Sequence, residues 1–240
     1  MVRQPGDIPA YKSGWARRLF LHIVAGRVRV AWLGGLKMSD AARQEPAHRR
    51  PHPPPKRNHR PSDVTPLTIF TIGHSTRPID EFIRLLKAHG VQRVVDVRTI
   101  PRSRHNPQFN RNQLSPALHR RKIHYRHMPG LGGLRRARPD SPNAGWRNAS
   151  FRGYADYMQT SEFEDNLEGC VDLAKQERVV LMCAEAVPWR CHRSLIADAL
   201  LARGIKASEI TSQIRTRPHS LTPFARVKGT HVTYPAARVT

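Results

Sequence analysis

The chain has 240 residues, enough for one domain of ordinary size with extensions, or for two small domains. It carries 41 Lys and Arg residues against 18 Asp and Glu residues, and the formal net charge of +23 favours a polyanionic partner, usually nucleic acid. Three cysteines at irregular spacings argue against a secreted disulfide framework and favour a reducing, cytoplasmic location.

Residues 1–66 are predicted to be a disordered basic extension. The segment from Met38 to Pro66 is rich in Pro, Arg and His and has almost no large apolar residue, so burial cannot offset the entropy lost on ordering. The most apolar stretch, residues 19–36, is interrupted by His and Arg, so it predicts neither a membrane span nor a signal peptide. Because Gly34-Gly35 could be encoded by a ribosome-binding sequence just ahead of Met38, residues 1–37 are also a candidate misassigned start.

Residues 67–214 alternate between strand and helix patterns. Strands are expected at Leu67–Ile72, Arg93–Val97, Ile123–His127 and Val179–Met182. Helices are expected around residues 79–86, 114–118, 154–158, 161–174 and 192–203. This alternation predicts a three-layer α/β domain, a mostly parallel sheet of four or five strands flanked by helices.

Helix ends are predicted from local capping signals. Ser75 or Thr76 is expected to begin the first helix, and Ser161 with Glu164 has the spacing of a capping box. Gly90 is expected to end the first helix and Gly204 the last. Residues 215–240, with five basic residues, three prolines and no acidic residue, are predicted to form a flexible basic tail.

Polar or glycine-rich segments follow all four expected strands. They are Gly73-His74-Ser75, Asp96-Val97-Arg98, Leu131-Gly132-Gly133 and Cys183-Ala184-Glu185. Because the carboxyl ends of parallel strands line one crevice, we expect these residues to share a site with Cys191-His192-Arg193. Within it, ligand binding is assigned to Ser75, Arg98, Gly132, Gly133, Arg190 and Arg193, and catalysis to His74, Asp96, Cys183, Glu185, Cys191 and His192.

These five segments, in this order, resemble the bacterial family called domain of unknown function 488. The resemblance runs from about Leu67 to Thr211 and leaves both ends of the chain outside. Each triplet alone is weak, but their joint spacing is specific. The resemblance implies an α/β fold and a shared cleft, and it implies no reaction, because no activity is established for the family.

The cysteines differ in their surroundings. Cys191 is expected at a helix start between Arg190 and Arg193, where backbone N–H groups and positive charge stabilise a thiolate and lower its pKa. Glu185 is a candidate general base, or a group that orients an imidazole. The alternative is that Cys183 and Cys191 are small buried packing residues. Cys170 shares a helix face with apolar residues and is expected in the core.

Three specific chemistries can be compared at this segment. A phosphatase or rhodanese loop has five residues between its cysteine and arginine, whereas six separate Cys183 from Arg190. A zinc site could use Cys183, Cys191, His192 and His74, although the spacing matches no standard finger or ribbon. A dithiol redox pair is a further alternative, without the usual Cys-x-x-Cys spacing.

Basic loops favour an anionic ligand. Residues 98–152 hold thirteen Lys or Arg residues and a single acidic one, Asp140, with aromatic residues among them. The sequence therefore predicts an enzyme acting on a nucleic acid, a nucleotide or another phosphorylated ligand, with no membrane partner. The alternative is a binding module that holds such a ligand without turnover. The sequence identifies neither a reaction nor a required cofactor.

Overall fold

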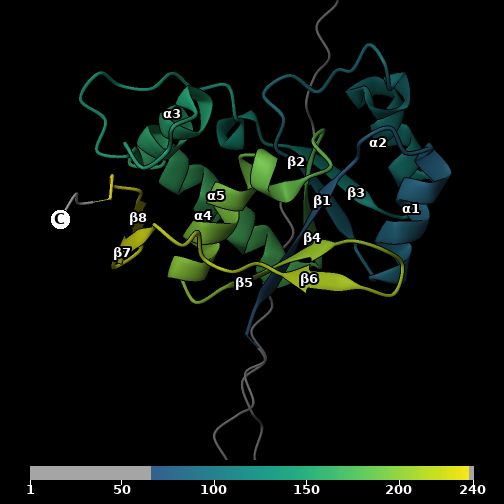
Figure 1. Cartoon of the computed structure of the whole chain (residues 1–240). Helices are drawn as coiled ribbons and strands as arrows, with labels where there is room; N and C mark the ends of the chain where they lie inside the picture. Colours follow the sequence, from purple (N-terminus) through teal and green to yellow (C-terminus); the bar gives the residue numbers. More distant parts are fainter. Residues whose placement is uncertain (1–65, 238–240) are drawn as a thin grey trace, which may run out of the picture. The chain divides into compact units, whose positions relative to one another are not determined.

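The computed structural model describes residues 66–237 (Figure 1). The predicted extension and the candidate start at Met38 lie outside the described residues, apart from Pro66. Among the described residues, no helix is long and apolar enough to cross a membrane.

A six-stranded sheet forms the centre of the domain. Its order is β3-β2-β4-β1-β5-β6, with bounds β1 Thr68–Gly73, β2 Arg93–Asp96, β3 His124–His127, β4 Val179–Cys183, β5 Lys206–Ile210 and β6 Thr216–Pro218. The first five strands are parallel, and β6 pairs antiparallel to β5 at one edge. The predicted mostly parallel sheet is therefore confirmed. Strands β5 and β6 were not predicted from the sequence.

Helices cover both faces of this sheet. They are α1 Ile79–Ala88, α2 Arg111–His119, α3 Ala149–Tyr157, α4 Ser161–Gln176 and α5 Arg193–Ala202. Strand β4 is buried throughout, and its residues alternate between two cores: Val180 and Met182 pack with residues of α1 and α2, whereas Val179 and Leu181 pack with residues of α3, α4 and α5. A strand covered on both faces reads as a continuous apolar run, which explains why β4 was visible in the sequence. The three-layer arrangement is confirmed.

The predicted helix starts differ from those observed. The N-cap of α4 is Thr160, whose side-chain oxygen accepts the N–H of Phe163 at 3.3 Å, so the prediction of Ser161 as the cap is wrong by one residue. The N-cap of α1 is Pro78, and neither Ser75 nor Thr76 caps it. Pro78 lacks an N–H and has a fixed φ, which suits it to a helix start.

The C-terminal segment is folded, so the predicted flexible tail is wrong for residues 216–237. After β6 the chain forms a hairpin of β7 Arg226–Lys228 and β8 His231–Thr233, and Tyr234 is fully buried. The buried carboxylate of Asp198 in α5 accepts hydrogen bonds from the Tyr234 hydroxyl at 2.8 Å and the Thr222 hydroxyl at 2.6 Å. A few well-placed contacts hold a segment whose composition is that of a solvated tail.

Candidate functional site

A cavity of about 660 Å³ lies at the carboxyl ends of the central strands. All four predicted loops reach its wall, which includes His74, Ser75, Arg98, Gly133, Cys183, Glu185, Arg190, Cys191 and His192. Asp96, Gly132 and Arg193 do not line the cavity, but each contacts a residue that does or lies beside one. The structure thus brings the predicted segments to one place.

The loops after β1 and β4 are joined through their backbones. His74 N–H donates to the carbonyl of Cys183 at 2.9 Å, and Ser75 N–H donates to the carbonyl of Ala184 at 3.0 Å. A Cβ atom on Gly73 would lie 2.1 Å from the carbonyl oxygen of Glu185, so only glycine permits this approach. The two strand ends therefore form one wall of the cavity.

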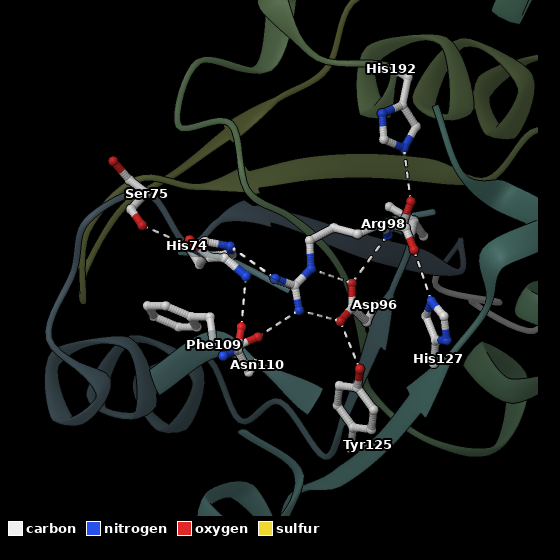
Figure 2. Close-up of polar contacts among 11 residues, drawn as sticks. His74, Ser75, Asp96, Arg98, Phe109, Asn110, Tyr125, His127 and His192 are labelled. Carbon is white, nitrogen blue, oxygen red and sulfur yellow. Dashed lines mark hydrogen bonds and ion pairs between the residues drawn. The ribbon is translucent and has the colours of Figure 1, made fainter. Parts of the chain in front are cut away.

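Asp96 and Arg98 form a buried ion pair behind the cavity (Figure 2). Arg98 donates from Nε to Asp96 Oδ1 at 2.8 Å and from Nη2 to Oδ2 at 2.6 Å. The Tyr125 hydroxyl also donates to Asp96 Oδ2, at 2.7 Å. Burial, followed by the neighbouring Asp96 charge, raises the pKa of Tyr125 well above its usual value, so this hydroxyl stays a donor. These contacts make Asp96 a positioning residue that orients Arg98, because its oxygens are occupied.

His74 is held in the neutral form between Arg98 and the backbone (Figure 2). Its Nδ1 lies 2.8 Å from the carbonyl oxygen of Ser75, and its Nε2 lies 3.3 Å from Arg98 Nη1. Since a carbonyl only accepts and a guanidinium only donates, Nδ1 carries the proton and Nε2 accepts. The ring stacks on Phe109 with centroids 4.1 Å apart. Burial lowers the pKa of His74 to about 4, so the ring is uncharged at neutral pH.

Cys191 lines the cavity, is almost fully buried, and has side-chain nitrogen atoms of two neighbouring residues close to its sulfur. It follows the short helix η3, Pro188–Arg190, and precedes α5 by two residues. Arg193 Nε donates to Cys191 Sγ at 3.4 Å, and His192 Nδ1 lies 3.8 Å from the same sulfur. The hydrogen bond from Cys183 lowers the pKa of Cys191 well below its usual value, and His192 and Arg193 lower it further, against the effect of burial. The same bond, with burial, keeps the pKa of Cys183 well above its usual value. The two shifts therefore favour ionisation of Cys191 over Cys183.

Arg193 connects Cys191 to a buried carboxylate that the sequence analysis missed. Its Nη1 lies 3.3 Å from Glu209 Oε2 in β5, and its Nη2 donates to the Glu185 carbonyl at 2.6 Å. Glu209 also accepts a hydrogen bond from the Thr71 hydroxyl in β1. A charged pair this deeply buried is costly unless every donor and acceptor is satisfied, as here. Predicting β5 as a strand would have placed Glu209 on the same side of the sheet as Arg193.

His192 is oriented by the backbone of the β2 loop (Figure 2). Its Nε2 donates to the carbonyl of Val97 at 3.1 Å, and its Nδ1 faces Cys191 Sγ. The loop at Gly133 passes close by, because a Cβ there would lie 2.5 Å from His192 Nδ1. The absence of a side chain at Gly133 therefore leaves space for the His192 ring.

A family model described as "Domain of unknown function DUF488" matches residues 78–200, about half of the chain. The chain belongs to the DUF488 family. No curated protein and no solved structure matches it. The matched range of the DUF488 domain contains Asp96, Arg98, Cys183, Cys191 and Arg193. From outside the range, His74 contacts Arg98 and Glu209 contacts Arg193.

Glu185 and Arg190 differ from the buried residues of the DUF488 site in being exposed at the cavity wall. The Glu185 carboxylate accepts a hydrogen bond from Val187 N–H at 3.0 Å. No hydrogen bond joins that carboxylate to Cys183, Cys191 or His192 among the described residues. The carboxylate of the predicted general base therefore makes no hydrogen bond to the cysteines or His192 within residues 66–237, and His192 is the residue that lies beside Cys191.

One group of side chains in the described part of the DUF488 domain could hold a metal ion. The ligand atoms of Cys183, Cys191 and His192 all lie within 4.8 Å of one another. A tetrahedral zinc site needs a fourth ligand. His74 does not supply it, because its Nε2 faces Arg98 and its Nδ1 faces the Ser75 carbonyl. A fourth position would therefore open into the cavity.

Proposed function

We propose that this DUF488 protein is an enzyme that acts on a nucleotide or another phosphorylated ligand, with Cys191 as its nucleophile. The observation that carries the proposal is the position of Cys191 Sγ, which lies at the cavity floor beside Arg193 Nε at 3.4 Å and His192 Nδ1 at 3.8 Å. Positive charge and hydrogen-bond donors around a cysteine favour the thiolate, which is the reactive form.

The charge of the cavity supports an anionic ligand. Arg102 and Arg190 are exposed at its wall, and neither forms an ion pair among residues 66–237. Among the described residues, Glu185 is the one acidic residue that lines the cavity. Arg98 also reaches it, but Asp96 neutralises that guanidinium. Two free arginines at a cavity of small-molecule size suit phosphate groups.

The geometry supports a covalent mechanism with defined proton positions. The Cys191 sulfur would donate an electron pair to an electrophilic atom of the ligand, forming a new bond to sulfur. The leaving group would depart with the electron pair of the bond that breaks and take a proton from His192 Nδ1, which faces the reacting sulfur. Water would then displace the sulfur and release the product, and its proton would return to His192 Nδ1, which restores the starting state.

Intact-mass spectrometry of the full chain with a mixture of nucleoside mono-, di- and triphosphates tests this function. We expect an adduct that maps to Cys191, or turnover of one mixture component, and neither should occur with Cys191→Ser. The matched control is Cys170→Ser, which removes the buried core cysteine and should retain the activity. Reversible ligand binding that is unchanged in Cys191→Ser would instead identify a binding module. One equivalent of bound zinc that protects both Cys183 and Cys191 would assign the pair as metal ligands and overturn the nucleophile.

A further inference from the structure

A second cavity adjoins the first. It has a volume of about 970 Å³ and shares Thr99, Ile100 and Arg102 with the first cavity. Its remaining wall comes from the loop before α2, from α2 itself and from the end of β3, and includes Asn110, Arg111 and His127. The first cavity already has the size of a small-molecule site, about 300–1,000 Å³. The second therefore leaves room for a further part of a longer ligand.

The two joined cavities carry repeated positive charge. Arg102 borders both, Arg190 borders the first and Arg111 the second. None of the three forms an ion pair within the described range 66–237. The described part of the chain places no acidic residue in the wall of the second cavity. Unpaired arginines that recur along a surface match a polymer with one phosphate per unit better than a single phosphorylated metabolite.

Two exposed apolar side chains belong to, or adjoin in sequence, the wall of the first cavity. Trp189, which precedes Arg190 in η3, has 64% of its surface exposed. It lines a separate cavity with Arg217, whose guanidinium lies 5.2 Å from the Trp189 ring centroid. Leu134, at the wall of the first cavity, is 73% exposed. Aromatic and guanidinium planes are the surfaces on which unpaired bases stack, largely independent of sequence.

The burial of Cys191 determines whether a nucleotide of a single strand or of a duplex could reach its sulfur. Cys191 has 4% of its surface exposed and lies on the cavity floor. A nucleotide within a duplex cannot reach such a position unless it leaves its stack, whereas a nucleotide of a single strand is free to enter. The combination of depth, spaced arginines and exposed apolar side chains therefore favours an unpaired strand.

We infer that the ligand is single-stranded nucleic acid, with one nucleotide in the first cavity, its neighbour along the second cavity at Arg102 and Arg111, and a further base on Trp189. This inference rests on the proposed function and names its substrate class. Arg111 and Trp189 are accordingly residues that select a polymer over a mononucleotide. Arg102 serves both forms of ligand.

Fluorescence anisotropy with a labelled eight-nucleotide oligothymidylate tests the path of the strand on the full chain. Arg111→Gln and Trp189→Ala should each weaken binding about fivefold, and Arg111→Gln should lower the slope of log Kd against log salt by about one, as expected for one lost phosphate contact. The matched control is Arg84→Gln, which removes the same charge from α1 and lines neither cavity. Residues 1–65 are present in every variant, so their charge contributes equally. An oligouridylate of the same length separates RNA from DNA.

Protection of Cys191 from iodoacetamide gives a second readout that reports the first cavity alone. Thymidine monophosphate and the oligothymidylate should both protect Cys191, the oligomer at lower concentration, and a duplex of equal length should not. Arg111→Gln should weaken protection by the oligomer and leave protection by the monophosphate unchanged. Equal binding by Arg111→Gln, Trp189→Ala and Arg84→Gln, with the monophosphate still protective, would overturn this inference and leave the proposed function standing. Protection by neither ligand would contradict both.

Discussion

The neutral state of His74 makes the stability of the domain depend on pH in a defined window. In the unfolded chain this histidine has its ordinary pKa of 6.5, and burial lowers the pKa to about 4 in the folded protein. Between these values the unfolded chain binds a proton that the native state does not, so the free energy of unfolding falls as the pH is lowered. The contribution is fully present above pH 6.5 and is lost as the pH falls through 4.

The size of this effect follows from the two pKa values. Each factor of ten in proton affinity corresponds to about 1.4 kcal/mol, so His74 should cost about 2.5 kcal/mol between pH 7 and pH 4.5. His74→Gln keeps a donor and an acceptor and removes the titration. Urea unfolding of wild type and variant at both pH values should therefore show a wild-type loss that exceeds the variant's by this amount.

The exposed His105→Gln serves as the matched control and should follow the wild type at both pH values. Equal pH dependence in wild type and His74→Gln would refute the reasoning. It would show that the ring is protonated in the native state at pH 4.5, and that the placement of its nitrogens against Arg98 and the Ser75 carbonyl is wrong.

Three further predictions concern stability. Asp96→Asn leaves Arg98 buried without its counter-charge and should lower the free energy of unfolding by about 3–5 kcal/mol in urea titrations. Asp140→Asn breaks an exposed pair with Arg138 and should change this free energy little, so equal effects of the two variants would contradict the burial argument. Glu209→Gln leaves the buried Arg193 charge without its counter-charge and should lower the free energy of unfolding by about 3 kcal/mol in the same assay. An unchanged unfolding midpoint would show that this pair contributes nothing to stability. Truncation after residue 214 removes the buried Tyr234 and the partners of Asp198, so we expect a loss of about 4 kcal/mol or an insoluble protein, and retention of the full thermal transition would contradict the folded C-terminal segment.

The central strands and the site segments were predictable because each leaves a local signal. The run Val179–Met182 is apolar on both faces, as a strand covered by two helical layers must be. The loops that follow the strands are polar or glycine-rich, and parallel topology brings their starts to one edge. Cys170 falls on the apolar face of α4, and its predicted place in the core is confirmed by complete burial.

The features that sequence reasoning missed depend on contacts between distant segments. Strand β5, Lys206–Ile210, contains Lys, Ser and Glu, and its strand state follows from pairing with β1 and from the Arg193–Glu209 contact. The C-terminal segment has a basic, proline-containing composition, and distant residues hold it in place. Asp198 accepts hydrogen bonds from Thr222 and Tyr234, and Gln159 donates to the carbonyl of Val232. Glu185 was given a role beside the cysteines because it is close in sequence, but its carboxylate turns to Val187 N–H. A buried polar residue whose partner lies on a distant element produces no periodic pattern in the sequence, so it cannot be predicted from periodicity.

The most direct test of the nucleophile is the alkylation rate of each cysteine in the native full chain, measured by iodoacetamide and peptide mass spectrometry between pH 5 and pH 9. Cys191 should react at pH 6, and its rate should level off below the pH at which a free thiol ionises, because Cys183, His192 and Arg193 lower its pKa. Cys170, whose pKa burial raises to about 12, should react only after unfolding. The same series with a chelator excludes protection by bound metal. Equal, slow alkylation of Cys191 and Cys170 at every pH, with and without chelator, would show that Cys191 is a packing residue and would contradict the proposed catalytic role.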